Sequence, residues 1–224
     1  YSPPVRSPGY GAPGRLRQGQ LEIGGGVAIP GGGGSPGAGG PYLAYAVCDW
    51  ANVEVGGDFF VGGWALGHLG GRFTYAPKRD LEFHGALDRE VGLGLGAGGQ
   101  DACPSYLDPQ AACDLRPWHD RLAFGAYAGG GAGYHFSFFA LFARGRVQAT
   151  AADGLPGTVY GTLHGGVQFR IARRVDLHAS GGFFGVNVGS KPQGLSPYWD
   201  LGLSVYFDVP RRPRAPNRTA RVFR

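Results

Sequence analysis

The chain has 224 residues, of which 44 are glycine, 17 are proline and 13% are aromatic, and its formal net charge is +5. This aromatic content argues against an intrinsically disordered chain, despite the many glycines and prolines. No apolar run approaches the roughly 18 residues that a membrane-spanning helix needs, whereas a membrane-spanning strand needs only about 9–11 alternating residues. The composition therefore excludes a helical membrane protein and leaves all-β architectures open.

Strands are predicted where apolar and polar residues alternate, because successive side chains of a strand point to opposite faces. Residues 1–17 have no such period and are predicted to be a Pro/Gly/Arg-rich N-terminal linker. Residues 18–209 are predicted to form one β-barrel. In chain order its strands are expected near residues 20–29, 43–47, 52–61, 69–75, 81–95, 122–128, 139–150, 158–171, 175–184 and 199–209.

The expected number of strands is about ten, and it becomes eight if the third and fourth are one strand. Longer or glycine-rich connections are expected after the first, fifth, seventh and ninth strands, and short ones after the second, fourth and eighth. Such alternation is typical of outer-membrane barrels, which have short turns at one end and longer loops at the other.

The chain has three cysteines, and two of them, Cys103 and Cys113, lie in a polar segment between predicted strands. A disulfide between them is predicted and would imply an oxidising compartment, with two free loop thiols as the alternative. The wide spacing of the cysteines and the scattered histidines indicate no metal site, and no cofactor is expected. A sequence that opens at Tyr1 and lacks methionine fits removal of a signal peptide, or a trimmed chain.

Three features indicate that the apolar faces of the strands point outward to lipid. Only two lysines, Lys78 and Lys191, occur in the chain, whereas a soluble β protein covers its outer face with lysine and glutamate. The polar faces are rich in glycine, which makes room inside a narrow barrel but weakens an exposed strand. Aromatic residues near strand ends also suit interfacial girdles: Tyr45, Phe73, Tyr75, Phe83, Phe169, Trp199 and Phe207. A soluble barrel or sandwich, with the apolar faces in its core, is the alternative.

The strand end "GLGLGAGG" and the last strand "YWDLGLSVYFDV" are typical sequences of one class of protein. With them, the chain resembles the small Gram-negative outer-membrane β-barrel proteins, porin-like or OmpA-like, as a generic member. The resemblance covers residues 18–209. It implies a transmembrane antiparallel up-and-down barrel in the bacterial outer membrane, in contact with lipid and lipopolysaccharide, with both termini periplasmic.

In such a barrel the polar faces of the strands line the lumen. Buried charges are costly unless they are paired, so a set of both signs predicts a lumen largely plugged by charged side chains. A structural scaffold or accessory subunit is then the expected role. A narrow porin-like channel is the alternative, with a preference for cations because acids are in excess. The lumen residues predicted to form this charge network are Glu22, Glu54, Asp58, Arg72, His84, Asp88, Arg144, Arg146, His164, Arg170, Asp176, His178 and Asp200.

The basic charge of the chain is concentrated at its two ends, which hold nine of the 21 basic residues and no acid. The ends are hypothesised to dock on an acidic partner protein or to fold back against the acidic mouth of the lumen, with solvated ends as the alternative. Nucleic-acid binding is not expected, because no aromatic platform accompanies the arginines. The C-terminal tail, residues 210–224, contributes Arg211, Arg212, Arg214, Arg218, Arg221 and Arg224.

One set of residues has the chemistry of a hydrolase. Asp176, His178 and Ser180 alternate along one strand, and an acid–His–Ser set can activate a serine nucleophile. The pair weakly resembles the His-x-Ser of outer-membrane lipid A deacylases, although Gly181 stands where that family has asparagine. The alternation points these side chains inward, away from lipid. A protein without enzymatic activity is therefore expected, with a lipid A-modifying hydrolase as the alternative.

Overall fold

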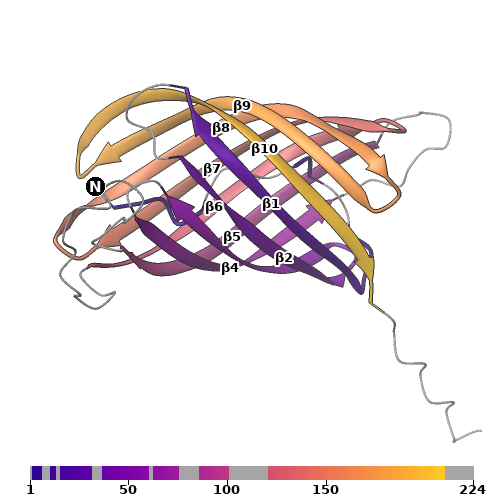
Figure 1. Ribbon diagram of the computed structural model, residues 1–224, viewed down its shortest axis with the longest axis horizontal. Helices are drawn as coiled ribbons and strands as arrows, with labels where there is room; N and C mark the ends of the chain where they lie inside the picture. Colours follow the sequence, from indigo (N-terminus) through magenta and orange to yellow (C-terminus); the bar gives the residue numbers. More distant parts are fainter. Residues whose placement is uncertain are drawn as a thin grey trace, which may run out of the picture.

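The computed structural model describes residues 2–6, 11–13, 16–31, 37–60, 63–75, 86–100 and 121–209. The described residues form ten antiparallel strands that follow one another around a closed barrel (Figure 1). The expected all-β up-and-down barrel is confirmed, with ten strands and not eight. The strands are β1 (Gln20–Pro30), β2 (Ala38–Cys48), β3 (Ala51–Phe60), β4 (Trp64–Tyr75), β5 (Ala86–Gln100), β6 (Arg121–His135), β7 (Phe139–Ala152), β8 (Leu155–Ala172), β9 (Val175–Val188) and β10 (Lys191–Asp208).

The barrel closes where the first strand pairs with the last. The β1–β10 register is unbroken from Gln20 opposite Asp208 to Pro30 opposite Tyr198. Closure leaves no row of unpaired backbone groups, which is the condition for strands to lie in a medium without water. No helix among the described residues is long and apolar enough to span a membrane.

The two faces of the sheet differ in polarity as the alternation predicts. Large apolar side chains lie outside, among them Leu95 and Trp199, which are 67% and 65% exposed. Charged side chains lie inside, and Glu54 is 1% exposed. A soluble protein places its apolar side chains in the core, so the soluble alternative does not fit. The outward apolar side chains and the buried charges are those of a transmembrane β-barrel.

The barrel has two rims, which we name by the strand ends they carry. The terminal rim carries the first residue of β1, the last residue of β10, and the turns at residues 49–50 and 173–174. The distal rim carries the turns at residues 153–154 and 189–190. β4 ends and β5 begins at the terminal rim, and β5 ends and β6 begins at the distal rim.

The expected alternation of long and short connections is wrong for the joints after β7 and β9. Only two residues join β7 to β8 and β9 to β10, because β8 and β10 each extend over 18 residues and take in segments expected to be loops. Gly154 and Gly189 make these tight turns possible, with φ angles of 69° and 59° that other residues rarely adopt. The expected short turn after β4 and the expected start of the fifth strand at residue 81 lie outside the described residues.

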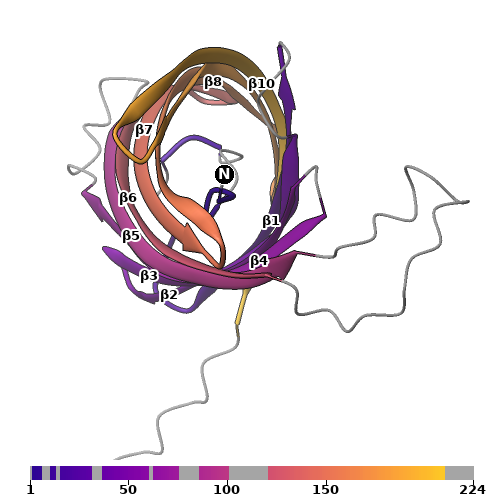
Figure 2. The ribbon, with the colours of Figure 1, turned by 90° about the vertical axis from the view of Figure 1, so that its left-hand side faces the viewer.

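The described part of the N-terminal segment, residues 2–6, 11–13 and 16–17, lies inside the barrel, where Figure 2 shows it within the ring of strands. Ser2 lies at the distal rim, where its carbonyl accepts a hydrogen bond from the Tyr160 hydroxyl. At the terminal rim the Gln18 backbone N–H donates to Asp49 Oδ1 over 2.9 Å. The segment therefore runs the length of the lumen before β1 begins. The sequence predicted a linker for residues 1–17, and its basic charge suggested only contact of the ends with the mouth of the lumen, not a position within it.

Candidate functional site

An ion-pair network occupies the middle of the lumen, and Arg72 of β4 is its centre. The Arg72 guanidinium reaches carboxylates of three other strands. Nη2 lies 2.8 Å from Glu22 Oε2 of β1, Nε lies 3.1 Å from Glu54 Oε2 of β3, and Nη1 lies 3.9 Å from Glu90 Oε2 of β5. All four side chains are buried. They come together because each occupies an inward-facing position of its strand.

Further polar groups extend the network around the wall. Arg144 Nη1 of β7 lies 3.0 Å from Glu90 Oε1. The Tyr42 hydroxyl of β2 donates to Glu22 Oε1 over 2.7 Å and lies 3.0 Å from Ser204 Oγ of β10. Each buried carboxylate of the network thus has a cationic neighbour, which offsets the cost of removing the charges from water.

Arg6 joins the network from the N-terminal segment. Its two terminal nitrogens bind the two carboxylate oxygens of Glu54, with Nη1 on Oε1 and Nη2 at 3.1 Å from Oε2. The Tyr127 hydroxyl donates to Glu54 Oε1 over 2.7 Å. The guanidinium carbon also lies 5.4 Å from the centre of the Tyr127 ring and 5.8 Å from that of Tyr42. Bidentate pairing and aromatic faces are the two contacts that suit a planar guanidinium.

The backbone of the same residue is held by an amide side chain of the wall. The Arg6 N–H donates to Gln148 Oε1 over 2.9 Å, and Gln148 Nε2 donates to the Arg6 carbonyl over 2.9 Å. Glycines of β5 and β6 make room for the neighbouring Val5. A Cβ atom on Gly125 would lie 2.6 Å from Val5 Cγ2, and one on Gly96 would collide with Val5 Cγ1. The glycine-rich inner wall therefore accommodates the segment.

Other charged residues of the lumen lie in smaller pairs away from this network. In the terminal half, Asp176 Oδ2 accepts from Gln168 Nε2 at 2.8 Å, and Arg170 Nε lies 3.3 Å from Asp176 Oδ1. His178 Nε2 lies 3.1 Å from Asp200 Oδ1. Asp58 Oδ2 lies 3.1 Å from His68 Nδ1, and Asp88 Oδ2 lies 3.4 Å from His135 Nε2.

The structure places the predicted lumen residues in several groups. Glu22, Glu54, Arg72 and Arg144 belong to the central network, and the Arg146 guanidinium carbon lies 5.5 Å from the centre of the Tyr127 ring. His164 packs edge-on against Phe142 and Tyr198. His84, the predicted Cys103–Cys113 disulfide and the C-terminal tail lie outside the described residues.

Sequence reasoning left several contributors out of the predicted charge network, among them Glu90, which pairs with both Arg72 and Arg144 and stands at an inward-facing position of β5. Tyr42, His68 and Tyr127 stand on the inward parity of their strands, so the alternation could have identified them. Arg6 lies in a segment of the sequence without alternating apolar and polar residues, so no periodic signal identified it.

The hydrolase-like set is inside the barrel but is not arranged as a relay along β9. The acid beside the His178 ring is Asp200 of β10, whereas Asp176 is bound to Gln168 and Arg170. Ser180 is buried, and within the described part of the chain its Oγ has no hydrogen-bond partner. All three side chains of the set point into the lumen and away from the apolar exterior.

Among the residues that the structure describes, one small cavity lies beside Arg6. It measures about 30 Å³ and is bordered by Arg6, Arg72, Tyr127, Arg144 and His164, and it has room for about one water molecule. Among the described residues, no three His, Cys, Asp or Glu side chains gather as ligands for a metal ion.

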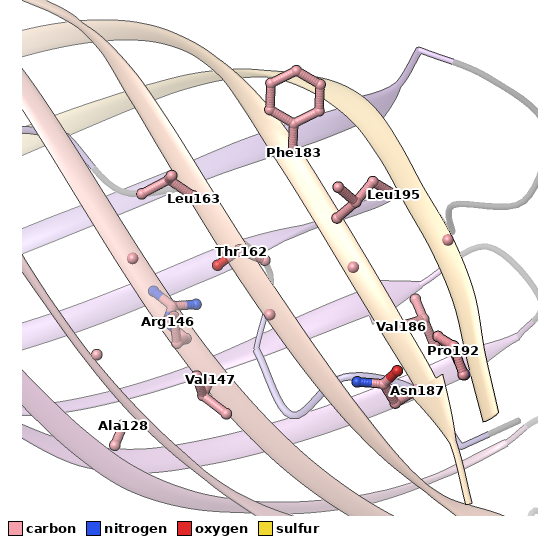
Figure 3. A pocket seen from close by; sticks show the side chains of 15 residues that line it. Ala128, Arg146, Val147, Thr162, Leu163, Phe183, Val186, Asn187, Pro192 and Leu195 are labelled. Atoms are coloured by element: carbon pink, nitrogen blue, oxygen red, sulfur yellow. The ribbon is translucent and has the colours of Figure 1, made fainter. Parts of the chain in front are cut away.

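A wider apolar groove, of about 720 Å³, lies on the outer wall across β6 to β10. Figure 3 shows Leu163, Phe183 and Leu195 standing along it. Its floor includes glycines of β7, β8 and β9, and a Cβ atom on Gly161 would meet no other atom within 4 Å. The groove therefore opens on the same apolar exterior as the exposed side chains of the wall.

Comparison with known proteins finds no matching family model and no matching curated protein. Among solved structures, the N-terminal β-barrel domain of Pseudomonas aeruginosa OprF is 13% identical, with a TM-score of 0.40, over 86% of this chain and 100% of that one. The NanC porin is 10% identical, with a TM-score of 0.40, over 83% and 98%. The outer membrane protease OmpT of Escherichia coli is 9% identical, with a TM-score of 0.40, over 84% and 94%. These values assign no substrate or activity to this chain.

Proposed function

We propose that this protein is a structural barrel of the bacterial outer membrane, without enzymatic activity, whose lumen is closed by its own N-terminal segment. It serves as a scaffold or accessory subunit in contact with lipid and lipopolysaccharide. One observation supports the proposal. Arg6 is not part of the strands, and in the lumen it binds Glu54 and Gln148 on the inner face of the wall. A segment held by charge and by backbone hydrogen bonds stays in the lumen.

The dimensions of the interior support closure. A barrel of ten strands has little free width once side chains fill its centre. Here the centre also contains a second stretch of backbone, and the cavity beside Arg6 measures about 30 Å³. A hydrated ion needs a continuous path of water, and a cavity of this size holds about one molecule.

Planar-bilayer recording tests this proposal. The purified full-length protein is expected to insert without stable conductance steps, whereas a steadily open channel in the unmodified protein would refute closure. A first control is that the folded protein requires detergent and migrates differently on gels before and after heating. Monodisperse protein in plain buffer would reject the membrane assignment altogether.

A narrow cation channel is the second candidate, and one observation favours it. Arg6 is the one cation of the central network that comes from outside the described strands, and around it the wall presents Glu22, Glu54 and Glu90. Departure of the segment would leave these acids facing an open path, and acidic linings select cations. Recording the unmodified protein under a salt gradient separates the cases, because a channel gives a cation-selective reversal potential and a closed scaffold gives no current. Arg6→Ala is expected to increase the current in both cases.

Two further parts of the proposal concern orientation and partners. We propose that the terminal rim is periplasmic and that the arginines of residues 210–224 bind an acidic protein there. Ser2 contacts Pro156 and Tyr160 toward the distal rim, so the proposal keeps the expected periplasmic position for the C-terminal end and not for Ser2. Deleting residues 210–224 is expected to remove co-purifying acidic proteins while barrel assembly is unchanged. Ser180→Ala is expected to leave the lipid A mass spectrum of producing cells unaltered, and a change would favour the hydrolase alternative.

A further inference from the structure

We infer that the lumen contains a binding site for an alkylguanidinium group carried on a peptide backbone, and that Arg6 is its resident ligand. The inference rests on the proposed closure by the N-terminal segment and gives it a chemical specificity. The site is made of wall residues from four strands: Tyr42 of β2, Glu54 of β3, Tyr127 of β6 and Gln148 of β7.

The side-chain half of the site fits guanidinium better than ammonium. The buried Glu54 carboxylate receives two parallel N–H groups from Arg6, a pairing that a lysine ammonium cannot reproduce. The rings of Tyr42 and Tyr127 lie 5.8 Å and 5.4 Å from the guanidinium carbon. A cation over an aromatic face within about 6 Å is attracted by the ring, and the delocalised guanidinium is also weakly hydrated and enters such sites at lower cost.

The backbone half recognises a peptide. Gln148 accepts from the Arg6 N–H and donates to the Arg6 carbonyl, both over 2.9 Å, as a neighbouring strand would. Gln148 is buried, so losing the ligand backbone would leave two buried polar groups of the amide to be satisfied by water. This half selects a residue within a chain over a free amino acid.

The site does not depend on its ligand for its shape. Glu54 is also held by Arg72, whose Nε lies 3.1 Å from Oε2, and by the Tyr127 hydroxyl at 2.7 Å. These contacts belong to the wall and remain when the Arg6 side chain is removed. The vacated site therefore keeps an oriented, buried carboxylate between two rings, ready to bind another guanidinium.

Chemical rescue in the full-length protein tests the inference. The Arg6→Ala variant lacks the equivalent of ethylguanidinium, so ethylguanidinium is the probe. Propylammonium is the matched control, because it has the same charge but cannot donate two parallel N–H groups to a carboxylate. Ethylguanidinium is expected to raise the thermal unfolding midpoint of Arg6→Ala saturably, with half-saturation in roughly the millimolar range for so small a ligand. Propylammonium is expected to have less than one-fifth of this effect. The double variant Arg6→Ala/Glu54→Gln and the unmodified protein are expected not to respond.

A rise that is equal for both cations, or that persists in the double variant, would overturn the site. Arg174→Ala serves as a further control, because it removes an exposed arginine whose Nη2 lies 3.0 Å from Asp208 Oδ2, and it is expected to show no rescue. Should Arg6→Ala not fold, Arg6→Lys keeps the charge without the fork. A midpoint equal to that of the unmodified protein would then reject guanidinium specificity, and one several degrees lower would support it.

Conductance separates this inference from the closure on which it rests. If ethylguanidinium stabilises Arg6→Ala while the unmodified protein already conducts, the binding site stands and closure fails. If the unmodified protein is closed but rescue is absent, closure stands and the guanidinium site fails.

Discussion

The central arginine of the lumen gives the sharpest test of the interior network. Arg72→Met keeps most of the side-chain volume and removes the charge that faces Glu22, Glu54 and Glu90. The matched variant is Arg174→Met, which removes the same chemical group from a pair with Asp208.

The expected magnitudes follow from burial. After Arg72→Met, Glu54 keeps Arg6 and Glu90 keeps Arg144, while the contacts described for Glu22 are then hydroxyl groups and no arginine. Removing one partner of a buried ion pair costs about 3–5 kcal/mol. The side chains of Arg174 and Asp208 are 60% and 66% exposed, and such a surface pair contributes about 0–1 kcal/mol. The two variants should therefore differ by at least about 2 kcal/mol in the free energy of unfolding.

Urea unfolding in detergent micelles, followed by tryptophan fluorescence, measures this difference. The four tryptophans of the chain report the transition, and the two variants should retain the same dependence of free energy on urea if they unfold from the same structure. If Arg72→Met and Arg174→Met lose equal stability, the network does not hold the barrel and the reasoning from buried charge is wrong.

Three further predictions use the same measurement. Gly161→Val, where an added Cβ meets no atom within 4 Å, should raise stability by about 0.5–1 kcal/mol, whereas Gly182→Val, whose Cβ would lie 2.6 Å from backbone of β8, should lower it by about 1–3 kcal/mol. Equal effects would mean that the inner wall is not close-packed. Leu93→Arg, on the exterior at the middle of β5, should cost about 2–4 kcal/mol, and Arg89→Leu nearer the rim should change stability by less than about 1 kcal/mol; similar costs would contradict membrane embedding. Gln148→Leu should cost about 1–3 kcal/mol, because the backbone of Arg6 loses both of its hydrogen bonds to the wall, and an unaffected protein would show that the N-terminal segment is not held there.

The faces of the wall were predictable from the sequence because they follow from parity alone. In β8, for example, Val159 and Leu163 alternate with Tyr160 and His164, and the structure puts the first pair outside and the second inside. Side chains of a strand alternate between its two faces, so the face of one residue fixes the face of each neighbour along the strand.

Contacts across the lumen were not predictable, because they depend on register and on distant parts of the chain. Asp176 and His178 are successive inward-facing residues of β9, yet the His178 ring contacts Asp200 of the next strand, β10. Arg6 bonds to Glu54 and Gln148, which are 48 and 142 residues away. The local sequence around Arg6 contains no periodic signal that such partners exist. The turn at Asp153–Gly154 did carry a signal, since Asp-Gly favours a two-residue hairpin, but the surrounding Gly and Pro were interpreted as a longer loop.

The position of residues 2–6, 11–13 and 16–17 inside the barrel constrains the order in which the molecule can assemble. A ring that is already joined between β1 and β10 would admit this segment only by drawing it lengthwise past buried arginines and glutamates. The hairpins between β1 and β10 must therefore gather around the segment while the sheet is still open. The junction of the first and last strands is then the final step, and it encloses a chain that is already in place.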